Sequence, residues 1–168
     1  DGGVSFSYTQ VLANNNNNRN ILFTTSPVCD DCLWVASSNG VWISTDKGQT
    51  FTFRSDPPQS SHGLAISPTD TSIIIHGYVD LTRSTNGGKS FAPITYWSLG
   101  NTNGAGSGHQ VSYQTSTDYI HADVRNLRYV GSSVYVATDG LLCKSSDNGT
   151  TWTNISNGVG IRENYMLG

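Results

Sequence analysis

Ser44-Thr45-Asp46-Lys47-Gly48-Gln49-Thr50-Phe51 recurs later in the chain as Ser145-Ser146-Asp147-Asn148-Gly149-Thr150-Thr151-Trp152. A third copy, Ser84-Thr85-Asn86-Gly87-Gly88-Lys89-Ser90-Phe91, has Asn in place of Asp. The first residues, Asp1-Gly2-Gly3-Val4-Ser5-Phe6, match the second half of a fourth copy. Self-similarity of this kind is the sequence signature of a repeat architecture. We therefore predict that the fold is built from repeated units, each containing one Ser-x-Asp-x-Gly-x-Thr/Ser-aromatic segment.

Each copy of the motif is predicted to form a β-hairpin turn that supports itself. The Asp or Asn side chain can accept hydrogen bonds from backbone N–H groups across the turn. The Gly supplies a positive φ, and the aromatic side chain covers the hairpin. The carboxylate is then occupied by its own turn, so we predict a structural role for it. The residues given this role are Asp1, Gly3, Asp46, Gly48, Phe51, Asn86, Gly88, Phe91, Asp147, Gly149 and Trp152.

Four strand-like segments surround each full copy of the motif. Asn39-Gly40 and Asp139-Gly140 are preferred two-residue hairpin turns between such segments. Repeats of roughly 40 to 60 residues, each forming one four-stranded antiparallel sheet, describe the blades of a β-propeller. The predicted strands are 20–25, 33–37, 41–45 and 50–54, then 63–67, 72–77, 81–84 and 90–96, then 125–130, 133–138, 141–145 and 151–155.

The strand pattern divides the chain into successive blades. Residues 1–19 are predicted to end a preceding blade and to continue into a linker, which includes the asparagine run. Blades follow at 20–60, at 61–124 with a long inserted loop (97–124), and at 125–160, and 161–168 would start the next blade. A closed ring normally needs at least about four blades. We therefore expect this segment to be part of one larger propeller, joined to the remainder of a larger polypeptide.

The composition supports an all-β class and excludes some partners. Only 12% of the residues are charged, whereas Gly, Ser, Thr and Asn are abundant, as suits short strands joined by tight turns. The net charge is −3 and the nine Lys and Arg residues are scattered, so no basic stripe is available for nucleic acid. No run of about eighteen apolar residues occurs, so we expect no membrane-spanning segment in this chain.

The motif copies resemble the Asp-box (BNR) repeat superfamily of β-propellers, and with their strands they cover nearly the whole chain. That superfamily includes sialidases, xyloglucan hydrolases, the sortilin luminal domain and a photosystem assembly factor. Residues 120–127, followed by 134–140, are similar to sortilin-like and xyloglucanase-like secreted proteins of Bacteroidota, many of them type IX secretion cargo. The resemblance implies a propeller fold and a secreted, extracellular or cell-surface location. It does not define the function, because function lies in loops carried by the fold.

Cys29-Asp30-Asp31-Cys32 has three possible interpretations. A zinc site would need a second pair of ligands, which the sequence does not supply. A redox CxxC normally opens a helix after a strand, and no helix is expected here. A disulfide between Cys29 and Cys32, closing a surface turn, is the interpretation that we prefer. The third cysteine, Cys143, lies in a strand-like run and is expected to be a small buried hydrophobe.

The predicted strand order separates two faces of the propeller. Loops between successive blades share a face with the turns between second and third strands, and ligand sites in propellers are found mostly on this face. The repeated turns lie on the opposite face, together with the turn that carries the two cysteines. The candidate ligand-binding residues of the first face are His62, Asp80, His121, Asp123, Arg125 and Asp139.

The inserted loop (97–124) also belongs to this first face. A long loop in a compact domain is usually functional or disordered, and a plain cover over a blade edge is the alternative here. In an extended segment His121 and Asp123 would share one face and could meet a metal or a substrate. A metal site would need a third ligand such as His109, and the alternative role is a structural hydrogen bond. We predict no metal site and no cofactor.

Two classes of function remain after these exclusions. A glycosidase needs two carboxylates about 5 to 10 Å apart, which Asp80, Asp123 and Asp139 could supply from adjacent blades. However, the catalytic signatures of xyloglucan hydrolases and sialidases are absent, as are the nucleophile elbow and the HExxH motif. We therefore predict no catalytic residues, and a non-catalytic cell-surface scaffold that binds a protein or glycan ligand. The alternative is a glycoside hydrolase propeller fragment, xyloglucanase-like or sialidase-like.

Overall fold

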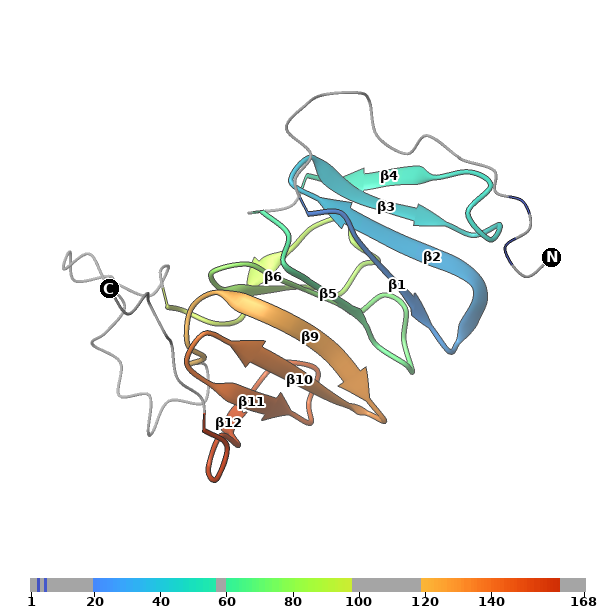
Figure 1. Cartoon of the computed structure of the whole chain (residues 1–168). Coiled ribbons are helices and arrows are strands. Elements are labelled where there is room, and N and C mark those ends of the chain that lie inside the picture. The colour runs from blue at the N-terminus through green and yellow to red at the C-terminus, as the bar shows by residue number, and fades with distance from the viewer. Residues whose placement is uncertain (1–2, 4, 6–19, 57–59, 98–118, 161–168) are drawn as a thin grey trace.

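The computed structural model of the chain describes residues 3, 5, 20–56, 60–97 and 119–160. Within these residues the protein consists of three separate four-stranded antiparallel sheets, which we call blades 1 to 3 (Figure 1). The predicted all-β class is confirmed. Blade 1 contains β1 (Leu22–Ser26), β2 (Cys29–Ser37), β3 (Gly40–Ser44) and β4 (Thr52–Ser55). Blade 2 contains β5 (Gly63–Ile66), β6 (Ile74–Gly77), β7 (Leu81–Ser84) and β8 (Ala92–Pro93), and blade 3 contains β9 (Val124–Val130), β10 (Ser133–Thr138), β11 (Leu142–Ser145) and β12 (Thr153–Asn154).

Each blade is a simple meander in which strands follow one another in sequence order. The first strands of the three blades, β1, β5 and β9, lie side by side, with β5 in contact with both of the others (Figure 1). The later strands of each blade extend outward from this inner row. Sequence order therefore equals packing order, and blade 2 lies between the other two blades, with one face toward blade 1 and one toward blade 3.

The core lies between blades and not inside them, because successive side chains of a strand alternate between the two faces of a sheet. Between blades 1 and 2, Trp34 and Val41 pack against Ile74, and all three are fully buried. Between blades 2 and 3, Ile75 and Val136 belong to a second cluster of the same kind. Truncating a buried tryptophan such as Trp34 would cost about 3 to 5 kcal/mol, so blade stacking holds the described fold together.

The structure corrects one prediction about the cysteines. Cys29 and Cys32 do not lie in the turn between the first two strands but in β2 itself, where Cys29 already pairs with Ser26 of β1. The turn consists of Pro27 and Val28 alone. The prediction failed because the polar Asp30-Asp31 pair resembles a loop, yet both aspartates are exposed on an extended strand end where water solvates them.

The inserted loop is only partly described, since residues 98–118, including His109, lie outside the described part of the chain. Its last residues are not a loose cover. Tyr119 and Ile120 are buried, and β9 begins at Val124, inside the predicted loop range. The fourth strands are the other difference, because β8 and β12 comprise two residues each and are shorter than predicted.

Candidate functional site

Two ends of the blades carry the polar and aromatic residues of interest. We call the end with the β2–β3, β6–β7 and β10–β11 turns the upper face; it also holds the segments that precede β5 and β9. The end with the three complete repeated turns is the lower face. The backbone N–H of Asp139 lies 3.4 Å from the Ala122 carbonyl, which brings the β10–β11 turn next to the segment before β9. All six predicted ligand-binding residues therefore lie at or next to the upper face.

Asp80 is a fully buried carboxylate in the β6–β7 turn. Its Oδ1 accepts hydrogen bonds from the backbone N–H of Trp97 and from the hydroxyl of Thr95, the latter at 3.3 Å. Thr95 Oγ1 in turn accepts a bond from the Leu81 N–H at 2.8 Å. Buried charges are stable only when they are paired or hydrogen-bonded in this way. Asp80 thus fixes the chain after β8 to the body of blade 2.

An aromatic cluster stands where the inserted loop leaves and rejoins the blades. The ring centroids of Trp97 and His121 are 4.6 Å apart, and those of Trp97 and Tyr119 are 5.9 Å apart. A Cβ on Gly140 would lie 2.6 Å from His121 Cδ2, so the imidazole rests directly against the β10–β11 turn. The cluster joins blade 2 to blade 3 and holds both ends of the insertion together.

The structure brings Arg125 and Asp139 together but does not pair His121 with Asp123. Both Arg125 Nε and Nη2 donate to the Asp139 carboxylate, the latter over 2.9 Å. His121 Nδ1 instead lies 3.2 Å from the carbonyl oxygen of Ala122, and among the described residues no hydrogen bond joins it to Asp123. Asp123 has a φ of 61°, which turns the chain sharply before β9. The two residues of the His-x-Asp segment therefore have separate environments.

His62 joins the same face from the segment before β5. Its ring meets the Tyr78 ring edge-on, with the ring centroids 4.7 Å apart, and the backbone N–H of His62 donates to the Gly77 carbonyl at 2.8 Å. The carbonyl of Tyr78 accepts a 2.7 Å bond from the Val124 N–H of β9. This contact links the upper ends of blades 2 and 3. Across the described ranges, no three His, Cys, Asp or Glu side chains gather closely enough to hold a metal ion.

The repeated turns of the lower face occupy their own acidic side chains. In blade 1, Asp46 Oδ1 accepts bonds from the Ser44 hydroxyl at 2.7 Å and from the Thr50 N–H at 2.9 Å, and Oδ2 accepts the Thr50 hydroxyl at 2.6 Å. Ser44 Oγ also accepts the Gly48 N–H at 2.8 Å. The bonds from the Thr50 hydroxyl and N–H and from Ser44 lower the pKa of Asp46 to about 2.

The other two turns repeat this pattern of hydrogen bonds. Asn86 Oδ1 accepts from the Ser90 N–H at 3.0 Å, and Asp147 Oδ1 accepts from the Thr151 N–H at 2.9 Å. Burial raises the pKa of Asp147, but the bonds from Thr151 and its neighbours outweigh this and lower it. An amide and two carboxylates perform the same task, so charge is not required of this position.

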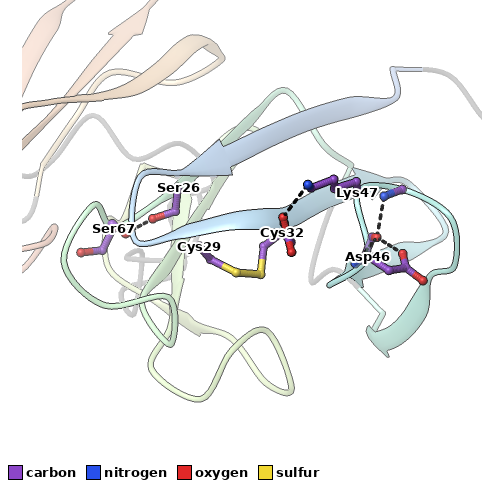
Figure 2. The surroundings of a disulfide bond; sticks show 9 residues. Ser26, Cys29, Cys32, Asp46, Lys47 and Ser67 are labelled. Atoms are coloured by element: carbon purple, nitrogen blue, oxygen red, sulfur yellow. Dashed lines mark hydrogen bonds and ion pairs between the residues drawn. A yellow bond between two sulfur atoms is a disulfide. The ribbon is translucent and has the colours of Figure 1, made fainter.

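A disulfide joins Cys29 to Cys32 and lies beside the first repeated turn (Figure 2). The Asp31 carbonyl, between the cysteines, accepts a 2.9 Å bond from the Lys47 N–H of that turn. The Asp31 carboxylate is also 3.3 Å from Lys47 Nζ. On the other side of the β1–β2 hairpin, the Ser26 hydroxyl donates to the Ser67 carbonyl of blade 2 at 2.9 Å. The cysteine segment thus supports both the turn and the joint between blades.

A groove of about 580 Å³ runs along the inner strands of the three blades. Its volume falls within the range of small-ligand pockets, roughly 300 to 1,000 Å³. Residues of β1, β5 and β9, and of the segments that directly follow them, form it, so only the stacking of blades creates it. It is lined by Phe23, Thr24, Thr25, Pro27, Leu64, Ala65, Ile66, Pro68, Asn126, Leu127, Arg128, Tyr129 and Gly131.

Sequence reasoning missed this groove and one buried histidine. His76 is fully buried in β6, with its Nε2 2.8 Å from the Ser61 hydroxyl, which also lies 3.1 Å from the Ser37 carbonyl of blade 1. Burial, with a smaller contribution from His62, lowers the pKa of His76 to about 4. The only sequence signal for the groove and for the buried histidine is the presence of polar residues inside strands, such as His76 and Arg128. No motif distinguishes these residues from other polar residues.

Comparison with known proteins identifies the fold and not the family. No protein-family profile and no curated protein matches the sequence. Solved structures do match: an ancestral GH74 enzyme (TM-score 0.55, 18% identity, 84% of this chain and 19% of the enzyme), the GH74 enzyme of Niastella koreensis (0.53, 21%, 79% and 22%) and the GH74 xyloglucanase of Xanthomonas campestris (0.54, 18%, 80% and 23%). Identities this low show likeness of fold alone.

The chain spans about a fifth of the length of these three enzymes. They are β-propellers, and the match extends over most of the present chain. The described residues include no helix long and apolar enough to cross a membrane. The stacked sheets and this likeness together show that the chain is an all-β protein made of consecutive β-propeller blades.

Proposed function

We propose that this chain is a non-catalytic, Asp-box type propeller scaffold that binds a protein or glycan ligand outside the cell. The observation that carries the proposal is the chemistry of the inner-strand groove. It offers hydroxyls, an amide, a guanidinium and an aromatic ring, from Thr25, Asn126, Arg128 and Phe23. None of its described lining residues is an Asp, Glu, His or Cys. Such a set suits recognition, and it offers no carboxylate, imidazole or thiol, the groups most often used for acid–base or nucleophilic catalysis.

The state of the upper-face carboxylates also supports binding over hydrolysis. A glycosidase requires an acid and a base or nucleophile that face the same substrate. Asp80 is fully buried and hydrogen-bonded to Thr95 and Trp97, and Asp139 is held by Arg125. Neither carboxylate is available to flank a sugar without breaking these contacts. The likeness to GH74 enzymes therefore supports a shared scaffold and does not favour a shared reaction.

The location outside the cell is supported by the covalent chemistry of blade 1. Disulfides persist in oxidising compartments and are rare in the cytosol. The Cys29–Cys32 disulfide, and repeated turns whose polar side chains are hydrogen-bonded within the turn, suit a protein that must remain folded without the help of intracellular chaperones. We accordingly propose that the protein is secreted or displayed at the cell surface.

The test is a titration of the isotope-labelled protein with a xyloglucan oligosaccharide, an acidic oligosaccharide and a short acidic peptide. We expect one of these probes to shift the NMR signals of groove residues such as Thr25 and Asn126, without any release of reducing ends. Arg128→Ser should weaken that binding about tenfold, the usual loss when one hydrogen-bonded charge contact of about 1.4 kcal/mol is removed.

Asp123→Asn and Asp139→Asn provide the matched control in the same titration. Both should leave binding unchanged, because neither carboxylate lines the groove. Hydrolysis of any probe that disappears in either variant would show an enzyme and overturn the scaffold. Failure of all three probes to shift groove signals would remove the groove as the ligand site.

A further inference from the structure

The repeated turns of blades 2 and 3 each dock on the preceding blade. In the second turn, the Gly88 carbonyl accepts a 2.7 Å bond from the Ser55 hydroxyl of blade 1. In the third turn, Arg83 Nη1 of blade 2 donates to the Asn148 carbonyl at 3.0 Å and to the Thr150 hydroxyl at 2.9 Å. Both joints therefore place a donor of one blade on the turn of the next.

Tyr129 of β9 connects the third turn to the inner-strand groove. Its side chain lines the groove and packs against the core between blades 2 and 3, and its hydroxyl donates to Asn148 Oδ1 at 2.9 Å. Burial raises the pKa of Tyr129 to about 12, although the Ser67 hydroxyl and the charge of Arg83 partly offset this. The phenol is therefore protonated at neutral pH and can donate. A chain of contacts runs from the groove wall through Tyr129 and Asn148 to Arg83 of blade 2.

The joint between blades 1 and 2 has no such connection among the described residues. Counting from the first serine of each turn along the paired strands, Ile66 of β5 occupies the register position of Tyr129. Ile66 also lines the groove but carries no hydroxyl. In the second turn, Gly87 stands at the position of Asn148 and has no side chain to accept a bond. Both turns are docked, but only the third is bonded to a groove-lining side chain.

The backbone at Asn148 shows what its side chain adds to the turn. Asn148 has a φ of 56°, in the left-handed region that favours glycine, and Gly87 has a φ of 70° at the same position of the second turn. Glycine therefore suits the backbone of this position at least as well as asparagine does. What the asparagine adds is the amide oxygen that holds the hydroxyl of Tyr129.

We propose that Tyr129 is the positioning residue of the inner-strand groove, and that the third repeated turn controls the groove through it. This inference rests on the proposed binding function of the groove. Asn148 fixes the phenol hydroxyl, and Arg83 fixes the backbone of Asn148 on blade 2, so the ring of Tyr129 is held in place as part of the groove wall. A wall that is ordered before the ligand arrives loses less conformational entropy on binding, which raises affinity. Neither Asn148 nor Arg83 lines the groove, so the turn acts on a ligand that it does not touch.

Asn148→Gly separates this connection from the docking of the turn. The variant keeps the backbone carbonyl that Arg83 binds and introduces the residue that the second turn already has, so it should fold. In titrations with the xyloglucan oligosaccharide, the acidic oligosaccharide and the acidic peptide, the affinity for the probe that binds should fall about fivefold, as expected for the loss of one hydrogen bond. Asn148→Asp retains an acceptor oxygen and should restore the affinity. Unchanged affinity in Asn148→Gly, or no rescue in Asn148→Asp, would overturn the proposal.

Arg83→Met and Ser55→Ala form a matched pair of variants in the same titrations. Each removes the donor that holds one docked turn, so each should loosen one joint. Only Arg83→Met should also weaken probe binding. Its effect should not add to that of Asn148→Gly, because both variants act through Tyr129. Equal losses of affinity in Arg83→Met and Ser55→Ala would reduce the effect to a general loosening of the blades and would refute the role of Tyr129.

The hydroxyl hydrogen of Tyr129 provides a readout that needs no ligand. In protein containing tyrosine labelled at the ring carbon that carries the hydroxyl, NMR should show slow exchange of this hydrogen with solvent in the wild type and in Asn148→Asp. Exchange should be fast in Asn148→Gly, and Tyr129→Phe assigns the signal. Fast exchange in the wild type would contradict the connection itself. Failure of every probe to bind a wild type with slow exchange would instead overturn the proposed function of the groove.

Discussion

At the residue scale, the repeated turn depends on hydrogen-bond acceptance more than on charge. Asp46 and Asn86 hold the same partners in their turns, although one side chain is ionised and the other is neutral. What the position requires is an oxygen that reaches the N–H four residues later. The ionised form of Asp46 gains extra stability from the Thr50 hydroxyl and N–H and from Ser44, and this extra stability depends on pH.

Asp46→Asn should therefore remove one source of acid sensitivity while keeping the turn. The folded-state pKa is lowered from 3.8 to about 2, so the carboxylate stabilises the fold above pH 3.8 and loses that effect as the pH falls through about 2. The variant should lose this carboxylate contribution at neutral pH, seen as a somewhat lower urea midpoint, and should show a shallower decline in acid. Asp56→Asn, an exposed aspartate outside the turn, is the control. An unchanged acid slope in Asp46→Asn would contradict the assignment.

At the element scale, the β1–β2 hairpin holds the first turn in place. The disulfide constrains the four residues that present the Asp31 carbonyl to Lys47 (Figure 2). Because the closed loop is so short, its entropic contribution is modest, about 2 kcal/mol by loop-closure arithmetic. Cys143 is separate from this chemistry, since burial raises the pKa of its thiol to about 11 and keeps it protonated.

Reducing the disulfide should loosen the turn before it unfolds the blades. Cys29→Ser with Cys32→Ser should lower the free energy of unfolding by about 2 kcal/mol and speed hydrogen exchange of the Lys47 amide. Adding a reductant to the wild-type protein should produce the same change, and adding it to the variant should have no effect. Equal exchange of the Lys47 amide in both proteins would show that the disulfide does not support the turn.

At the scale of the whole molecule, stability resides in the joints between blades. Trp34, Ile74 and Val136 are all fully buried there, and the polar node of Ser37, Ser61 and His76 crosses the first joint. A polar group inside an apolar joint makes that joint sensitive to protonation, because burial disfavours the charged imidazole. Gly149 of the third repeated turn packs closely against blade 2, so a larger side chain at this position would disturb the joint between blades 2 and 3.

Protonation of His76 should weaken the joint between blades 1 and 2. The pKa is lowered from 6.5 to about 4, so the unfolded chain binds a proton first and stability falls as the pH drops from 6.5 toward 4. The loss of unfolding free energy between about pH 7 and pH 4.5 should be on the order of 2 kcal/mol, because a tenfold difference in proton affinity corresponds to about 1.4 kcal/mol. His76→Gln should flatten the dependence in urea unfolding. A His76 NMR titration near pH 6.5 would refute the lowered pKa.

Gly149→Ala should destabilise the protein more than Gly158→Ala. The two glycines have nearly equal φ values, 82° and 81°, so the backbone strain of about 1 to 2 kcal/mol is common to both. Only at Gly149 would the new methyl group collide with Ile94 of blade 2. Overpacking adds roughly a further 1 to 3 kcal/mol, measurable as a difference in urea midpoint. Equal losses would mean that the turn is not tightly docked.

How much of the fold and of the candidate site could be predicted from the sequence depends on how far apart in the chain the interacting residues lie. The repeated turns, the Asp139-Gly140 hairpin and the grouping of strands into blades are local, and the structure shows them as expected. The predicted Asn39-Gly40 turn is wrong by one residue, because Ser37 pairs with Gly40 and leaves Ser38 and Asn39 as the turn. The six predicted ligand-binding residues do lie at one end of the blades, because alternation of strand direction fixes which loops share an end. Their contacts were not predictable, because they join residues that are well separated in the chain. Asp80 accepts a hydrogen bond from Trp97, and His121 packs against Gly140.

The sequence by itself determined that the protein is all-β, built of four-stranded units, each closed by a turn that satisfies its own polar groups. Those features arise within a few tens of residues, where spacing and side-chain chemistry decide the outcome. Only the tertiary structure decided that the core lies between blades, that the cysteines extend β2, and that the inner strands leave a groove. The physical reason is that core packing joins residues from different blades. The stacking of the blades decides which faces come into contact, and no local sequence pattern encodes it.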